Sequence, residues 1–283
     1  MLAAAKSPRP RLLRQEAHMF RLLAICLFLS LSSSLFAQSV TPTATANSDP
    51  QALTISAAAL AAMTKGVSVS DVTLTGTATE TAGATVNTGA ATFKAKGYFE
   101  ARTDFSASGD SIVRAVGSSG YPVGSWTTGD GMSHPLAFHN ALVDAAWFFP
   151  ALSCLSIATQ PNAVLKYVGQ ETRYGTSVQH IRFWRVADGS LANQALLTDL
   201  SAIDVFLDAS TFLPSAITYN THPENDASRS FLVEVRYSNY QPVNGIQVPF
   251  HVQKFLSNSL IVDFQAAQAA INSGLSDSDF AVQ

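Results

Sequence analysis

The side chains best suited to chemistry in this sequence are one cysteine and five histidines that follow residue 37. The histidines are spread along the chain: His134, His139, His180, His222 and His251. His134 and His139 are five residues apart and would point to different faces of a helix, which does not suit a shared metal ion. No His-Glu-x-x-His, Gly-x-Ser-x-Gly, phosphate-binding or dinucleotide-binding motif is present. We therefore predict no metal site, no cofactor and no catalytic residue.

Cys154 lies within the apolar run Ala151–Leu155 and is interpreted as a buried filler rather than as a nucleophile. A hydrolase would need a histidine beside it, and His139 is the one that the same segment offers. A Ser-His-Asp triad stays open as an alternative, because its members can be distant in sequence. Nothing in the sequence favours such a triad, so we predict a protein that is not an enzyme.

The composition narrows the class of protein. Of the 283 residues, 47% are apolar and 13% are charged, and 17 Lys and Arg against 20 Asp and Glu give a net charge of −3. So much apolar surface argues against a disordered chain. The lack of a basic excess argues against a nucleic-acid partner. The two cysteines of the chain are too few for a disulfide framework or a cysteine-built zinc site.

The first part of the chain predicts export. Residues 22–36 are uncharged and follow Arg21, and their length fits the core of a secretory signal better than a membrane span. We predict a signal peptide over residues 1–37, cleaved near Ala37, with Met19 as an alternative start, and export to the periplasm. An uncleaved signal that anchors the chain in a membrane is the alternative. Residues 38–48 are predicted to be a flexible leader.

Residues 49–283 are predicted to form a single domain that begins with a helix. Asp49 and Pro50 suit the N-cap and first position of a helix that runs to Lys65, with Gly66 as its stop. Its expected apolar face comprises Leu53, Ala57, Leu60, Ala61 and Thr64.

After this helix the hydrophobic period changes to two, which predicts about ten or eleven strands with one face buried. The clearest alternations run over residues 72–79, 93–102, 230–237 and 246–253. Residues 133–158 interrupt this pattern with an apolar segment rich in Leu, Ala, Phe and Trp at helical spacing. We predict a helical hairpin there that covers an apolar surface, as a lid or a plug.

The last eighty residues resemble the outer-membrane lipoprotein carrier (LolA-like) superfamily. The resemblance rests on the order of several short segments: Ile203–Asp208 with Thr211–Pro214, Tyr237–Tyr240, Val243–Ile246 with Val248-Pro249, Ile271–Leu275, and Asp279-Phe280. It implies an α+β, mainly antiparallel fold: an incomplete, half-open β-barrel whose concave face is covered by helices and holds lipid. The parts read from periodicity, namely a first helix, a half-buried sheet and an apolar insert, agree with that fold.

From these observations we predict an exported carrier or sensor that binds an acyl chain, a lipoprotein or another apolar ligand on the concave face. The residues predicted to line the site are Phe93, Phe99, Trp147, Phe148, Phe149, Phe231, Val233, Val248 and Phe250. The expected partners are lipid or lipoprotein acyl chains and a membrane-associated donor or acceptor protein. The alternative is a periplasmic structural or protein-interaction module with a self-filled barrel and no ligand. An empty apolar cavity would favour the carrier, and a packed interior the interaction module.

Overall fold

The structure is a computed structural model that describes residues 48–143, 145–158, 160, 162–186 and 191–282. All of them belong to one compact unit, Pro42–Gln283. The predicted signal peptide and residues 38–47 of the predicted leader lie outside the described residues. Within the described ranges, no helix combines the length and the apolarity that crossing a membrane requires.

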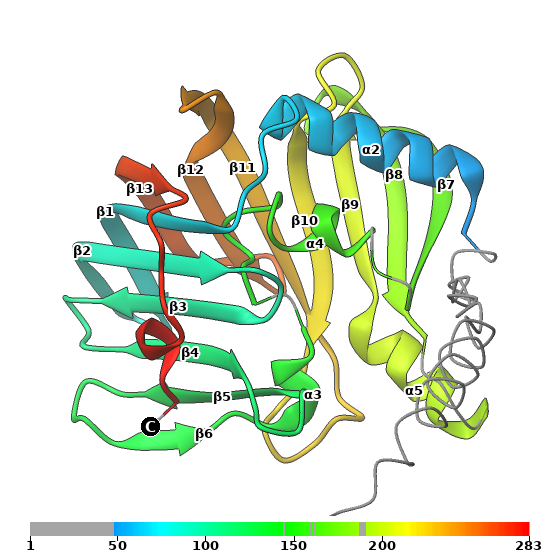
Figure 1. Ribbon diagram of the computed structural model, residues 1–283. Coiled ribbons are helices and arrows are strands. Elements are labelled where there is room, and N and C mark those ends of the chain that lie inside the picture. Colours follow the sequence, from blue (N-terminus) through cyan, green and yellow to red (C-terminus); the bar gives the residue numbers. More distant parts are fainter. Residues whose placement is uncertain (1–47, 144, 159, 161, 187–190, 283) are drawn as a thin grey trace, which may run out of the picture. The chain divides into compact units, whose positions relative to one another are not determined.

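Thirteen strands form a single sheet in the described part of the chain, two or three more than the sequence analysis expected. Their bounds are β1 Asp71–Ala82, β2 Thr85–Lys96, β3 Glu100–Phe105, β4 Ser111–Val116, β5 Pro122–Thr127, β6 Ser133–Pro135, β7 Ala163–Arg173, β8 Thr176–Arg185, β9 Ile203–Asp208, β10 Pro214–Thr221, β11 Phe231–Val243, β12 Ile246–Leu256 and β13 Ser259–Ile271. The strand order is β6-β5-β4-β3-β2-β1-β13-β12-β11-β10-β9-β8-β7, and each neighbouring pair is antiparallel. The sheet curves strongly without closing (Figure 1), which is the predicted half-open barrel.

Alternating residues along the strands place apolar side chains on one face, which we call the concave face. The alternation predicted for β1, β11 and β12 is observed, with Leu74, Val235 and Val248 fully buried. The run 93–102 is a correction, because it is two strands and not one. A hairpin turn at 97–99 joins β2 to β3, and Gly97 has the positive φ of 54° that such a turn requires.

Helix α2, Pro50–Thr64, lies against the concave side of the sheet and starts as predicted. The Asp49 carboxylate accepts a 2.9 Å hydrogen bond from Gln51 N, and the chain leaves the helix at Lys65 in the left-handed conformation. The buried face is rotated by about one residue from the predicted one; it consists of Ala52, Ile55, Ser56, Ala59, Met63 and Thr64. Small residues on this face let the helix approach β7, β8 and β12. The helix thereby bridges strands that are far apart in the sheet (Figure 1).

The apolar insert has a different structure from the predicted helical hairpin. Ser133–Pro135 is the edge strand β6, and the helical parts are two single turns, α3 at Phe138–Ala141 and α4 at Cys154–Ile157. Pro150 cannot donate a helical hydrogen bond. The sheet also binds backbone groups that a helix would satisfy internally, since Tyr237 Oη donates a 2.6 Å bond to the Trp147 carbonyl. We call the described residues of 136–158 the plug, because this segment packs on the concave face.

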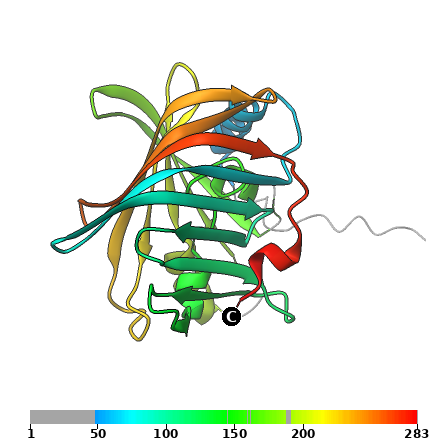
Figure 2. The same ribbon diagram turned by 90° about the vertical axis from the view of Figure 1, so that its left-hand side faces the viewer.

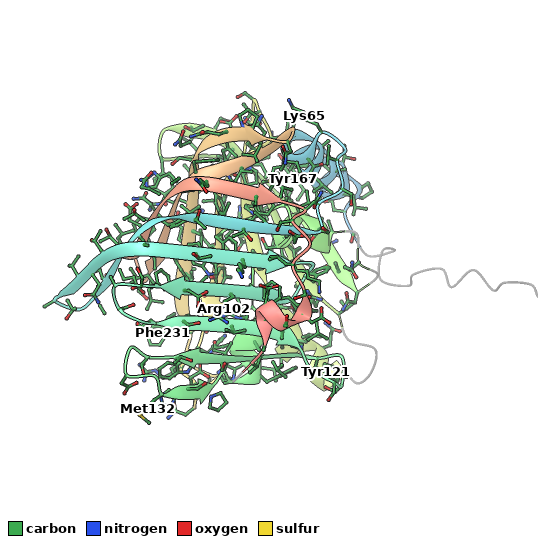
Figure 3. The ribbon with its side chains drawn as sticks, turned by 60° about the vertical axis from the view of Figure 1, so that its left-hand side comes forward. Lys65, Arg102, Tyr121, Met132, Tyr167 and Phe231 are labelled. Atoms are coloured by element: carbon green, nitrogen blue, oxygen red, sulfur yellow. The ribbon has the colours of Figure 1, made fainter. Side chains whose placement is uncertain are left out.

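The opposite, convex face carries polar side chains and the C-terminal segment. The short 3₁₀ helix η2, Asp277–Phe280, contacts β3 and β4 (Figure 2). Lys94 Nζ lies 2.8 Å from Asp279 Oδ1, and Phe280 is fully buried. Arg102, labelled in Figure 3, lies beside this segment and pairs with Asp104 at 2.8 Å. Helix α5, Leu191–Ser201, precedes β9 in the chain and contacts β8. The sequence analysis did not predict this helix.

Candidate functional site

The concave face gathers most of the residues that the sequence analysis predicted to line a ligand site. Six of them are buried in one continuous core: Phe93, Trp147, Phe148, Phe149, Val233 and Val248. Phe250 is partly buried against the same core. Phe93 and the plug residues Trp147 and Phe148 are at most 3% exposed. The structure therefore brings these side chains together. They contact one another, as core residues do, and do not surround an open space.

Phe93 is the centre of the contact between sheet and plug. Its ring centroid lies 5.4 Å from that of Trp147, 5.2 Å from that of Phe148 and 4.3 Å from that of Phe264 on β13. These are ordinary packing distances for aromatic rings. The plug therefore fills the space beside Phe93 on the concave face.

Phe99 and Phe231 lie outside this core. Phe99 falls in the β2–β3 turn, where it stacks on Tyr98 with the ring centroids 5.6 Å apart. Phe231 is half-buried at the start of β11, and the Arg229 guanidinium lies 5.6 Å from its ring. The alternation failed at Phe99, because it could not locate the turn that separates β2 from β3. Phe231 keeps the alternation of Val233 and Val235 but is the first residue of its strand.

An open pocket of about 450 Å³ lies beside the plug on the concave face, and we call it the Trp147 pocket. Its lining residues are Glu80–Gly83, Asn87, Thr103, Phe105, Ser108, Asp110, Ile112, Trp147, Lys254, Leu256, Ile261 and Val262. Most of the surface is apolar, and the plug contributes one residue, Trp147. The volume lies within the range of about 300–1,000 Å³ that is typical of small-molecule sites.

Three charged side chains, Glu80, Asp110 and Lys254, line the Trp147 pocket. Lys254 Nζ lies 4.6 Å from the centroid of the Trp147 ring, a cation–π contact. Burial raises the pKa of Glu80, the nearby Asp110 adds to this effect, and a hydrogen bond from Ser108 opposes it. The sequence analysis missed Glu80 and Lys254. A signal was available, since they continue the inward alternation of β1 and β12 by one more step.

The plug is attached to the sheet by Asn140, a buried residue that the sequence analysis also missed. Its amide nitrogen donates to the His222 carbonyl at 2.7 Å and to Glu224 Oε1 at 2.8 Å. Its amide oxygen accepts from His222 N at 3.0 Å and from Thr221 Oγ1 at 3.1 Å. All four hydrogen bonds that an amide side chain readily makes are formed. Nothing in the sequence connects Asn140 with residues some eighty positions later.

One Ser-His-Asp arrangement occurs on the convex face. Ser238 Oγ lies 3.1 Å from His251 Nδ1, and His251 Nε2 lies 2.9 Å from Asp263 Oδ1. Ser238 is exposed, and these side chains do not line the Trp147 pocket. They sit at neighbouring positions of β11, β12 and β13, where such side chains form cross-strand pairs.

The proposed pairing of His139 with Cys154 is not seen. His139 Nε2 bonds to the Pro223 carbonyl at 2.9 Å, whereas Cys154 Sγ is buried 3.8 Å from the Pro150 carbonyl. Among the described residues, no group of three or more His, Cys, Asp and Glu side chains is arranged to hold a metal ion.

Comparison with known proteins supports the fold. No family model matches the sequence, and a search of curated proteins finds no match either. Among solved structures, the chain is similar to a domain described as that of an outer membrane lipoprotein-sorting protein from Vibrio parahaemolyticus, with 11% identity, 81% of this chain and 96% of that chain covered, and a TM-score of 0.52. It is also similar to a DUF1329 family protein from Desulfovibrio piger, with 10% identity, 82% and 96% covered, and a TM-score of 0.53.

A LolA superfamily protein from Nitrosomonas europaea matches at 11% identity over 81% of this chain and 97% of that chain, with a TM-score of 0.48. The likeness to the first two structures extends over almost their entire length. These two likenesses show the half-open fold that the resemblance of the sequence implied.

Proposed function

We propose that this protein is an exported, non-enzymatic carrier or sensor that binds an acyl chain or another apolar ligand on the concave face of its half-barrel. The observation that carries the proposal is the Trp147 pocket, an apolar opening of about 450 Å³ between the sheet and the plug. Burial of an acyl chain there would contribute about 0.8 kcal/mol for each methylene group. Binding of this kind needs no catalytic residue.

The rim of the pocket suggests how a ligand would be oriented. An acyl chain would lie over Trp147 and against Phe105, Ile112 and Val262. Lys254 and the neighbouring carboxylate of Glu80 would face the polar end of the ligand, where water remains accessible. The lipid or lipoprotein acyl chain would arrive from a membrane-associated donor and leave to an acceptor. This route requires the export that the signal peptide predicts.

A second candidate, a protein-interaction module without a ligand, is favoured by the packed interior. The plug covers the concave face, and Phe93, Phe148 and Phe149 are fully buried. In that case the exposed edges of the sheet, β6 and β7, would be the surfaces for a partner chain.

The experiment that tests the proposal uses the tryptophan fluorescence of Trp147. The chain contains three tryptophans, so the W126F/W184F variant keeps Trp147 alone, and W126F/W147F keeps Trp184 alone as the matched control. We expect dibromostearyl alcohol, an uncharged acyl chain with a bromine quencher, to quench the Trp147 variant saturably and to leave the Trp184 variant unchanged.

Native mass spectrometry of the purified protein provides the second measurement, since a bound lipid would add a discrete mass. Absence of both the saturable quenching and a bound lipid would refute the carrier and favour the interaction module.

A further inference from the structure

Arg185, at the end of β8, is a buried cation that has no acidic partner among the described residues. The residue is 8% exposed. No carboxylate of the described residues lies within ion-pair distance of its guanidinium, whereas Arg102, Arg173, Arg182 and Arg236 all pair with Asp or Glu. Burying an arginine without a counter-ion is costly, because the charge loses its hydration and gains no opposite charge in return.

Two aromatic rings compensate part of that cost. The Arg185 guanidinium carbon lies 4.7 Å from the ring centroid of Phe99 and 5.3 Å from that of Tyr98. Stacking of this kind occupies the faces of the guanidinium and leaves the N–H groups in its plane available as donors. The Tyr98 hydroxyl is buried, and Arg185 is the described side chain that interacts with it. Burial also raises the pKa of Tyr98, so this phenol keeps its proton at neutral pH.

Arg185 lies at a second pocket of about 390 Å³, which we call the Arg185 pocket. It is lined by Phe99, Gly120, Tyr121, Pro122, Phe138, Leu142, Asn162, Arg185, Val186 and Leu197. At its rim, Tyr121 is 63% exposed and Phe138 is 52% exposed, with their ring centroids 6.2 Å apart. Arg185 is thus the one charged side chain in a lining that is otherwise mainly apolar. It shares no lining residue with the Trp147 pocket.

We propose that the Arg185 pocket binds an amphiphile with a single negative charge, the carboxylate of a long-chain fatty acid. The carboxylate would accept hydrogen bonds from Arg185, and the chain would lie on Phe99, Leu142 and Leu197. A carboxylate fits better than a phosphate dianion, because one cation balances one negative charge. The inference does not depend on ligand binding at Trp147.

The test compares palmitate with hexadecanol, which has the same chain without the charge, by isothermal titration calorimetry on the full mature chain. In R185M we expect the affinity for palmitate to fall about tenfold or more, because the charge-assisted hydrogen bonds are lost. Hexadecanol should bind wild type and R185M equally. R182M is the matched control, since Arg182 lies on the same strand with its side chain 51% exposed, and we expect it to bind palmitate as wild type does.

Thermal unfolding without ligand gives an independent readout. R185M should be as stable as wild type or more stable, since methionine removes an uncompensated buried charge. A large loss of stability in R185M would show that the chain itself satisfies Arg185, and it would overturn the proposal. Two further variants, D144N and D188N, change acidic positions outside the described residues. If either variant raises the affinity for palmitate, that acid is the partner of Arg185 and the proposal is overturned.

The outcomes separate this site from the proposed function. Equal palmitate binding by wild type and R185M would overturn the Arg185 site and leave the Trp147 pocket standing. Binding of palmitate that depends on Arg185, without quenching of Trp147 by the brominated alcohol, would support the Arg185 site alone. Absence of any palmitate binding would overturn the Arg185 site, whatever the result at Trp147.

Discussion

The two faces of the curved sheet are built from the same strands but held together in different ways. Along β11, Val233 and Val235 point to the concave face and pack against the core, while Glu234 and Arg236 lie on the convex face. The concave face is stabilised by apolar burial, which has no preferred direction. The convex face is stabilised by pairs of specific charges and hydrogen bonds, such as those that Glu234 forms with Arg173 and Arg236.

This difference between the two faces indicates which of them could accommodate a ligand. Apolar contacts between the sheet and the plug can be exchanged for contacts with an acyl chain at little cost, because both bury similar surface. The charge pairs of the convex face cannot be exchanged in this way, since each needs a partner of stated charge and geometry. Substitutions on the two faces should therefore differ in size and in their dependence on pH.

The largest effect is expected on the concave face, in F93A. Removing this ring leaves a cavity among Phe105, Trp147, Phe148 and Phe264. We expect the free energy of unfolding to fall by about 3–5 kcal/mol. Urea denaturation measures this change. F231A is the matched control, because Phe231 is half-buried outside the core, and it should cost less than about 1 kcal/mol. Similar losses of unfolding free energy in F93A and F231A would contradict the distinction between the buried core and the half-buried position of Phe231.

An intermediate effect is expected where the plug is attached, in N140A. The substitution leaves the His222 N–H and carbonyl without their Asn140 partner and removes one hydrogen bond from the Glu224 carboxylate, which keeps that from Ala137 N. We expect a loss of about 1–3 kcal/mol, together with faster hydrogen exchange of the amides in the plug. Hydrogen exchange measured by mass spectrometry checks the second effect.

The control for N140A is N220A, at a half-buried position on β10. Unchanged exchange of the plug in N140A would show that the hydrogen bonds of Asn140 are not needed to hold the plug in place.

The smallest effect is expected on the convex face, in E234Q. Burial disfavours ionisation of Glu234, but hydrogen bonds from Arg236 and Tyr174 and the charges of Arg236 and Arg173 outweigh it and lower its pKa below the ordinary 4.5. A lowered folded-state pKa adds stability above pH 4.5, which is lost as the pH falls through the folded-state value. E234Q should therefore cost about 1 kcal/mol at neutral pH and little once Glu234 is protonated.

Denaturation of wild type and E234Q between neutral and acidic pH measures this convergence. E171Q, at a side chain that is 47% exposed, is the matched control and should show a constant small difference. A difference between E234Q and wild type that does not shrink at acidic pH would contradict the role assigned to the charge of Glu234.

Periodicity predicted most of the long strands and which face of each strand is buried. The start of α2 at Asp49-Pro50 and the inward residues of β1, β11 and β12 follow from local patterns, because capping and alternation depend on neighbouring residues. The half-open barrel was instead implied by the resemblance of the last eighty residues. Reasoning from local patterns failed at residues 97–99, where a turn lies inside an unbroken alternation. It also misjudged the buried face of α2, because several faces of this alanine-rich helix have similar hydropathy.

The sequence by itself determined which side chains are apolar, which face of each long strand is inward, and that the apolar segment 133–158 must be buried or lie over an apolar surface. Only the tertiary structure decided that the plug is irregular, that Asn140 attaches it to the residues after β10, and that Arg185 is buried beside Tyr98 and Phe99. The physical reason is that these features depend on contacts between residues far apart in the chain. Local propensity does not specify such contacts; the curvature of the sheet brings them about.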